Sequence, residues 1–248
     1  MHPEICSIGP FVVYSYGFML VVAFLVAVTL ASYEAKRQGI NPDFIFNFNF
    51  IIFVFGIIGS RLFYVSYNLG YYFDNPKEII MLSHGGMSWF GGFFLGLCAG
   101  LIYIRLKKER IYKVLDLVVP FLALAQSLGR IGCFLNGCCF GKESIYGVYF
   151  PVHGLVLIPT QLYSSFILLL IFIILRFIQL RPHRLGQVFY TYLFLYSIKR
   201  FFIEFLRGDN KLIIFDLTLF QLISIAIFII ATLKLINRDS AHFPKKQR

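Results

Sequence analysis

The sequence predicts an all-α integral membrane protein, and two features of its 248 residues support this class. Hydrophobic residues make up 58% of the chain and charged residues only 14%, roughly half the charged share of a soluble domain. Long runs with few charges recur, close to the ~20 apolar residues that a spanning helix needs, whereas the alternating strands of an outer-membrane barrel are absent. About seven transmembrane helices are therefore expected, at about residues 10–33, 44–67, 85–104, 114–130, 158–175, 186–198 and 212–233.

The seven runs differ in character from one end of the chain to the other. The first, fifth and seventh have inner halves made almost entirely of Leu, Ile, Val and Phe. The second ends in a stretch that contains Arg61, and the third repeats glycine at positions 92, 96 and 100, a spacing that allows close helix contact. The fourth is bracketed by Asp116 and Arg130 and contains Pro120, and ionisable residues follow the sixth.

The basic residues between the runs predict the orientation. Most Lys and Arg residues fall in four segments on one side: Lys36 and Arg37; Arg105, Lys107, Lys108, Arg110 and Lys113; Arg176, Arg181 and Arg184; and Lys234, Arg238, Lys245, Lys246 and Arg248. Since basic loops stay in the cytoplasm, we expect the N-terminus outside and the C-terminus in the cytoplasm. The net charge of +11 then faces anionic lipid headgroups and indicates no nucleic-acid partner.

The chain is expected to form a single transmembrane domain over residues 1–248, because no linker separates a second one. The largest outer segment, residues 131–157, would form a small outer head within that domain. No removed signal peptide is expected, since the first thirty residues lack a basic n-region and a small-residue cleavage site.

The segment at residues 129–141 reads Gly-Arg-Ile-Gly-Cys-Phe-Leu-Asn-Gly-Cys-Cys-Phe-Gly. It places Arg130, Asn136 and three cysteines among glycines beside a hydrophobic run. An arginine at the membrane centre costs ~3 kcal/mol or more unless it is paired or hydrated, so it indicates a functional site. The alternative is an arginine that extends to a lipid headgroup beside a glycine-rich turn.

Four arginines on the predicted outer side need an explanation, because the topology rule disfavours them there. Arg61, Arg130, Arg200 and Arg207 each lie within or at the outer end of a predicted helix. One interpretation is that they converge on an anion such as phosphate, which the planar guanidinium binds through two oxygens. The other is structural: Glu204 lies four residues after Arg200 on the same helix face and would pair with it.

The cysteines and the nearest histidine allow several interpretations. Cys133, Cys138 and Cys139 have no matched second pair and no histidines at zinc-like spacing, so no metal site is predicted. Cys133 could form a disulfide with one of the adjacent thiols on an oxidising outer side. His84 precedes the glycine doublets Gly85-Gly86 and Gly91-Gly92, which frame the third run and could line a cavity.

Six short motifs in order resemble the prolipoprotein diacylglyceryl transferase family of bacterial inner membranes, and the resemblance covers most of the chain. They are Ser7-Ile-Gly-Pro10 with Tyr16-Gly17; Gly59-Ser-Arg61 with Tyr64; Gly85–Gly92; the signature at residues 129–141; Pro159-Thr-Gln-Leu-Tyr163; and Arg200–Arg207 followed by Asp209.

The resemblance implies a transferase that moves sn-1,2-diacylglyceryl from phosphatidylglycerol to the lipobox cysteine of an exported preprolipoprotein, releasing glycerol 1-phosphate. The partners would be phosphatidylglycerol, preprolipoprotein signal peptides and membrane lipid, with no cofactor. The active site would face the outer leaflet of the bacterial cytoplasmic (inner) membrane. The implied catalytic residues are Arg130, Arg207, His84 and Glu204, and the implied phosphatidylglycerol-binding residues are Arg130, Asn136, Arg61, Arg200, Tyr16, Gln161 and Gly137.

The sequence departs from the family pattern at three places. Phe90 stands where many members have a histidine, Cys133 and Cys138 replace Asn and Glu, and Ile158 replaces another histidine. The base that removes the thiol proton is therefore left open between His84, Glu204, Glu143 and a thiol activated by the arginines alone. A non-catalytic family member that binds phospholipid or lipoprotein, and a membrane transporter, remain alternatives.

Overall fold

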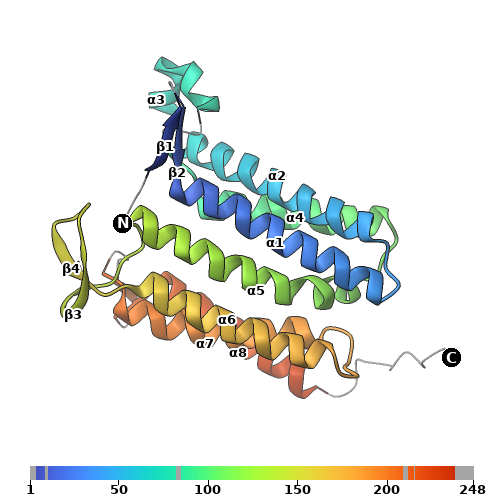
Figure 1. Cartoon of the computed structure of the whole chain (residues 1–248). Coiled ribbons are helices and arrows are strands. Elements are labelled where there is room, and N and C mark those ends of the chain that lie inside the picture. The colour runs from blue at the N-terminus through green and yellow to red at the C-terminus, as the bar shows by residue number, and fades with distance from the viewer. Residues whose placement is uncertain (1–3, 9–10, 82–84, 209–211, 215, 238–248) are drawn as a thin grey trace. The chain divides into compact units, whose positions relative to one another are not determined.

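The computed structural model describes residues 4–8, 11–81, 85–208, 212–214 and 216–237. It divides into two compact units, which are described separately below. The first unit combines residues 1–30 with residues 115–248, and the second contains residues 31–114. Figure 1 gives the order of the elements.

Long helices dominate both units and confirm the all-α class. Six of the helices within the described ranges are long and apolar enough to cross a membrane, and α7 is not among these six. Helix α7 carries Lys199, Arg200 and Glu204, which lower its hydropathy. The seven long helices are α1 (Ser15–Arg37), α2 (Pro42–Tyr67), α4 (Trp89–Leu106), α5 (Ile111–Asn136), α6 (Thr160–Gln179), α7 (Gln187–Leu206) and α8 (Leu219–Ile236).

Each helix covers one of the seven predicted runs, but several boundaries were predicted wrongly because short hairpins precede or follow the helices. Strands β1 (Glu4–Ile8) and β2 (Phe11–Tyr14) pair before α1, so that helix starts at Ser15. Strands β5 (Leu212–Ile214) and β6 (Leu217–Thr218) pair before α8 in the same way. The remaining short elements are α3 (Leu69–Asp74) and the 3-10 helix η1 (Pro76–Ile80).

The segment expected to form an outer head is only partly outside the helices. Helix α5 continues through residues 131–136, because the run from Ile131 to Leu135 is apolar and helix-compatible despite Gly132. The rest forms a loop and an antiparallel hairpin of β3 (Glu143–Phe150) and β4 (Leu155–Leu157). Figure 1 shows this hairpin at the end of the first unit where α5 finishes.

Apolar and polar contacts together join α5, α6 and α7 in the first unit. Their shared core consists of Val119, Ala123, Leu168, Ile171, Leu175, Val188 and Tyr192. Beside it, Ser127 Oγ donates to the Ser165 carbonyl at 2.8 Å and Ser165 Oγ donates to the Ser127 carbonyl at 2.9 Å. Such reciprocal bonds join helices where lipid cannot satisfy polar groups.

Asp116, on α5, caps the N-terminal end of α7. Its carboxylate accepts hydrogen bonds from Gly186 N at 2.5 Å and Phe189 N at 2.8 Å. Gly186, the residue before α7, has φ +85° and no side chain with which to cap the helix. Asp116 therefore supplies the acceptor that an N-terminal Ser or Asp normally provides.

Replacing Asp116 with alanine is expected to lower the free energy of unfolding by about 1–3 kcal/mol, because two backbone N–H groups, one buried and one partly buried, lose their acceptor. The thermal unfolding midpoint of the purified protein would measure this, with the exposed Glu109→Ala as the matched control. Equal midpoints for the two variants would contradict the capping role.

Glycines bring α2 and α4 into close contact in the second unit. A Cβ atom at Gly92 would lie 2.9 Å from the Gly56 carbonyl oxygen, and one at Gly100 would lie 2.9 Å from Ile52 Cδ1. The packing role expected of the glycine repeat is thus confirmed. Gly91 makes the tightest approach, since a Cβ atom added there would lie 2.3 Å from both Gly59 O and Phe63 Cβ. Gly91, in the second of the two glycine doublets, therefore packs against α2.

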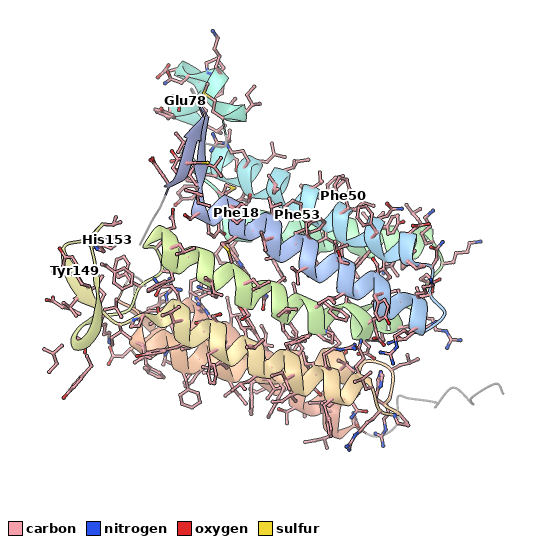
Figure 2. All side chains as sticks on the ribbon, in the orientation of Figure 1. Phe18, Phe50, Phe53, Glu78, Tyr149 and His153 are labelled. Atoms are coloured by element: carbon pink, nitrogen blue, oxygen red, sulfur yellow. The ribbon has the colours of Figure 1, made fainter. Side chains whose placement is uncertain are left out.

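Large apolar side chains point outward from the helices of both units (Figure 2). Phe18 on α1 is 50% exposed and Phe50 on α2 is 48% exposed. Water would disfavour so much exposed aromatic surface, whereas lipid tails accept it. The outward faces of these helices agree with a protein that crosses the membrane several times.

Candidate functional site

The signature segment begins on the last turns of α5 and leaves the helix in a tight loop. Arg130, Cys133 and Asn136 are spaced i, i+3, i+6 and so lie along one side of the helix. Gly137 follows with φ +74° and Cys139 with φ +62°. A left-handed backbone is costly for a residue with a Cβ atom, so contacts from elsewhere must hold Cys139 in this conformation.

Side chains from the start of α6 hold this loop. Thr160 Oγ1 donates to the Cys139 carbonyl at 2.8 Å, and Gln161 Nε2 donates to the Cys138 carbonyl at 2.7 Å. Gln161 is fully buried. The Pro159–Tyr163 motif therefore positions the loop that carries Cys138 and Cys139, the cysteine loop. Gln161 thus has a structural role in addition to the phosphatidylglycerol-binding role that the family resemblance implies.

The end of α7 meets the same loop through backbone bonds. Lys142 N donates to the Leu206 carbonyl at 2.8 Å, and Gly141 pairs with Arg207 as an isolated β-bridge. A Cβ atom at Gly141 would lie 2.7 Å from the Leu206 carbonyl oxygen, so glycine is needed for this approach. These contacts place Arg207 next to the end of the signature segment, residues 129–141, which also contains Arg130.

The three signature cysteines converge. The sulfur atoms of Cys133, Cys138 and Cys139 lie within 4.8 Å of one another, and all three are free thiols. Hydrogen bonds from Cys133 and Cys138, with the positive charges of Arg130 and Arg207, hold the pKa of the Cys139 thiol below its usual value. Of the three thiols, Cys139 is therefore the one whose negatively charged form these neighbours favour.

Four cationic side chains lie within electrostatic range of one another, and two of them, Arg130 and Arg207, also act on the Cys139 thiol. Arg130, Arg200 and Arg207 all act electrostatically on Lys199, which is only 4% exposed and lies 4.9 Å from the centre of the Tyr196 ring. Three of the four outer arginines therefore share one region of the first unit. Buried positive charge is stabilised by negative charge nearby, such as that of Glu204 or of an anionic ligand.

Arg200 and Glu204 form the ion pair that their spacing predicts. Arg200 Nη2 lies 3.2 Å from Glu204 Oε2, and Thr218 Oγ1 donates to Glu204 Oε1 at 3.0 Å. The Arg200 guanidinium also stacks on the Phe220 ring at 4.4 Å. Glu204 is buried and committed to these partners, an arrangement that fits a positioning group better than a base.

Tyr16 and Asn136 complete the polar surroundings. Tyr16, on the first turn of α1, interacts electrostatically with Arg130 and with the three thiols. Helices α1 and α5 meet closely here, since a Cβ atom at Gly132 would lie 2.8 Å from Met19 Cβ. The Asn136 side chain interacts with the Cys138 thiol, and the Gly137 carbonyl pairs with His153 Nε2 at 2.9 Å.

Arg61 lies in the second unit, and its guanidinium binds backbone carbonyls. Nε donates to Ile79 O at 2.9 Å, and the two terminal nitrogens contact the carbonyls of Glu78, Met81, Gly85 and Gly86. These bonds account for the five donors of an arginine. The side chain is buried and lies 5.3 Å from the Tyr72 ring. Arg61 therefore fastens the chain that leads into α4.

The candidates for the base have different surroundings. His84 lies outside the described residues. Glu143 is exposed at the start of β3, and Phe90 is half-buried on α4. Lys199 was missed as a site residue. In the sequence it is one of several basic residues on the predicted outer side, and only the packing of α7 shows that it is buried.

Apolar helices that enclose arginines, a lysine and thiols at one end define a multi-pass membrane protein with an internal polar site. Residues 3–237 match the family model for prolipoprotein diacylglyceryl transferase. The chain is 36% identical over 237 residues to the phosphatidylglycerol–prolipoprotein diacylglyceryl transferase of Clostridium tetani, covering 93% of this chain and 95% of the relative. It is 34% identical to the enzyme of that name from Staphylococcus carnosus, covering 99% and 94%, and 32% identical to that of Staphylococcus aureus, covering 98% and 91%. The chain belongs to the prolipoprotein diacylglyceryl transferase family.

Proposed function

We propose that this protein transfers the sn-1,2-diacylglyceryl group of phosphatidylglycerol to the lipobox cysteine of exported prolipoproteins and releases glycerol 1-phosphate. Relatives that carry this name match along nearly the whole chain. The observation that supports it within the molecule is that Arg130, Arg200 and Arg207 share one region of an otherwise apolar bundle, with Arg130 and Arg207 also near the Cys139 thiol. Three guanidiniums in one region favour a bound phosphate group.

The reaction makes two demands on the site. The substrate thiol, with an ordinary pKa near 8.5, must lose its proton, and the phosphate monoester that leaves must be stabilised as it gains charge. Arg130 and Arg207 are assigned the second task, because both act electrostatically on Cys139 in the signature segment and the guanidinium fork matches two phosphate oxygens. Arg200, fixed by Glu204, orients the headgroup.

The other site residues fall into supporting roles. Asn136 and Tyr16 act as hydrogen-bonding partners of the headgroup. Gln161 and Gly137 make the contacts that hold the loop directly after Asn136. Arg61, whose guanidinium binds five backbone carbonyls, supports the glycine-rich chain before α4. His84 is kept as a candidate base, and Glu204 is assigned to positioning.

The site is proposed to face the outer leaflet of the bacterial inner membrane, within one transmembrane domain of seven spans. The charge pattern supports this orientation: Arg176, Arg181 and Lys234 lie at the ends of α6 and α8, away from the signature loop. The N-terminus would then be outside and the C-terminus in the cytoplasm.

The purified protein, given phosphatidylglycerol and a synthetic lipobox peptide, is expected to attach a diacylglyceryl group to the peptide cysteine. Mass spectrometry of the peptide would detect the adduct, and a peptide with serine in place of that cysteine is the control. A folded protein that binds phosphatidylglycerol but never yields the adduct would favour the non-catalytic family member instead.

A further inference from the structure

The thiols of Cys133, Cys138 and Cys139 are arranged as a set of metal ligands would be. Their sulfur atoms lie within 4.8 Å of one another. Three thiolates bound to one tetrahedral zinc ion, with Zn–S bonds of ~2.3 Å, are separated by roughly 3.8 Å. Small side-chain rotations would therefore bring the three sulfur atoms to this separation without moving the backbone.

The fold holds these thiols together at some cost. Adjacent residues normally direct their side chains apart, yet the left-handed backbone of Cys139, with φ +62°, lets its sulfur join that of Cys138. Thr160 and Gln161 fix the carbonyls of both residues at 2.8 Å and 2.7 Å. The convergence is thus set by two helices and does not depend on a flexible loop.

The charges near the thiols suit a zinc–thiolate complex. Three thiolates and one Zn²⁺ carry a net charge of about −1, whereas a complex with neutral ligands would be positive. Arg130 lies about one helical turn before Cys133 on α5, and the backbone of Arg207 pairs with Gly141, two residues after Cys139. The two guanidiniums would oppose a free dication but stabilise the anionic complex as a whole.

The ligand set leaves one position of a tetrahedral ion open. In the described ranges, no His, Asp, Glu or further Cys joins the three thiols. Structural zinc sites use four protein ligands, whereas catalytic sites use three and keep the fourth for water or substrate. Gln161 supports the second case: its buried Oε1 accepts no hydrogen bond from the described residues, so it is available to a molecule bound beside the loop.

We infer that Cys133, Cys138 and Cys139 bind one Zn²⁺ as thiolates and that its fourth position receives the cysteine thiol of the peptide substrate. The second half of this inference rests on the proposed function. It assigns the thiol activation to the signature loop, next to the arginines that are assigned to the phosphate.

The step balances as follows. The peptide thiol gives its proton to solvent as its sulfur replaces a zinc-bound water, because a coordinated thiol is deprotonated. A sulfur lone pair then forms the C–S bond to the glyceryl carbon, while the C–O bond to phosphate breaks and its electron pair leaves with glycerol 1-phosphate. The thioether is a weaker ligand than a thiolate, and water displaces it.

Metal content tests the site without any substrate. The full chain, purified in detergent with a reductant and supplied with Zn²⁺, is expected to hold about one zinc ion per chain after desalting. Cys139→Ser should lose most of it, whereas the double variant C6S/C98S, which removes the two exposed cysteines, should keep it. Equal zinc in the two variants, or none in the parent protein, would overturn the site, as would a disulfide between Cys133 and Cys138 or Cys139 in protein isolated from cells.

Cobalt substitution tests the open position. Co²⁺ bound by thiolates gives charge-transfer and ligand-field absorption, and the lipobox peptide should intensify the charge-transfer band by adding a fourth sulfur. The serine peptide should leave the spectrum unchanged. Identical spectra with both peptides would refute substrate coordination. Transfer at full rate in zinc-free protein would refute the catalytic role of zinc and leave the proposed function intact. A protein that binds zinc but never transfers the diacylglyceryl group would instead refute the proposed function.

If Cys139→Ser does not insert into membranes, the parent protein still decides the question. Removal of zinc with a chelator should reduce transfer at least about 10²-fold, the scale expected for loss of a nucleophile-activating group. Zn²⁺ should restore it and Mg²⁺ should not, because thiolates select zinc over magnesium. Restoration by Mg²⁺, or insensitivity to the chelator after verified removal of zinc, would contradict the inference.

Discussion

Replacing Arg130 with alanine is expected to reduce diacylglyceryl transfer by about 10²–10³-fold or more, the loss seen when a donor to a developing anion is removed. Arg130 lies on the last turns of α5, half-buried, within electrostatic range of Lys199, Arg200 and Cys139. Its guanidinium would stabilise the phosphate most strongly once the C–O bond breaks. The rate of peptide lipidation at saturating phosphatidylglycerol measures this effect.

Two further variants separate this role from a simple need for positive charge. Arg130→Lys keeps the charge but loses the two-pronged geometry, so its activity should fall between those of the parent and Arg130→Ala. Lys142→Ala removes an exposed charge from the loop that follows the signature and should leave activity nearly unchanged. An Arg130→Ala protein that inserts normally and keeps substantial activity would refute the phosphate role.

Replacing Gly91 with alanine is expected to destabilise the second unit by about 3 kcal/mol or more, because the added methyl group meets rigid backbone. Its Cβ atom would lie 2.3 Å from the Gly59 carbonyl oxygen and 2.3 Å from Phe63 Cβ. Alanine normally favours a helix over glycine by ~1 kcal/mol, so the sign of the effect depends on this clash. The thermal unfolding midpoint in detergent, monitored as the loss of soluble protein on heating, measures the change.

Gly70 provides the matched control for this prediction. It also lies in a helix of the second unit, α3, but nothing lies within 4 Å of a Cβ atom added there. Gly70→Ala should be neutral or slightly stabilising. If Gly91→Ala unfolded at the same temperature as Gly70→Ala, the close contact between α2 and α4 would be contradicted.

The candidate site was predictable where chemistry is local in sequence. Arg130, Cys133 and Asn136 stand a few residues apart, and a helix places such residues on one side. The four-residue spacing of Arg200 and Glu204 likewise indicated the ion pair that α7 forms. Arg61 was harder to interpret, because its guanidinium binds five backbone carbonyls 17 to 25 residues further along the chain. No sequence pattern indicates which side chain a backbone carbonyl will meet.

The sequence by itself determined the class of protein and which segments form its long helices, though not their boundaries, since lipid admits only long apolar segments whose backbone is satisfied internally. It did not determine that Lys199 is buried among arginines, that Gly91 meets Gly59, or that three sulfur atoms converge. Each of these depends on contacts between segments far apart in the chain, such as Thr160 and Gln161 on the cysteine loop and Lys142 on the end of α7. Helix formation depends on neighbouring residues, whereas the chemistry of this site depends on which helix ends meet, and only the packing of the tertiary structure decides that.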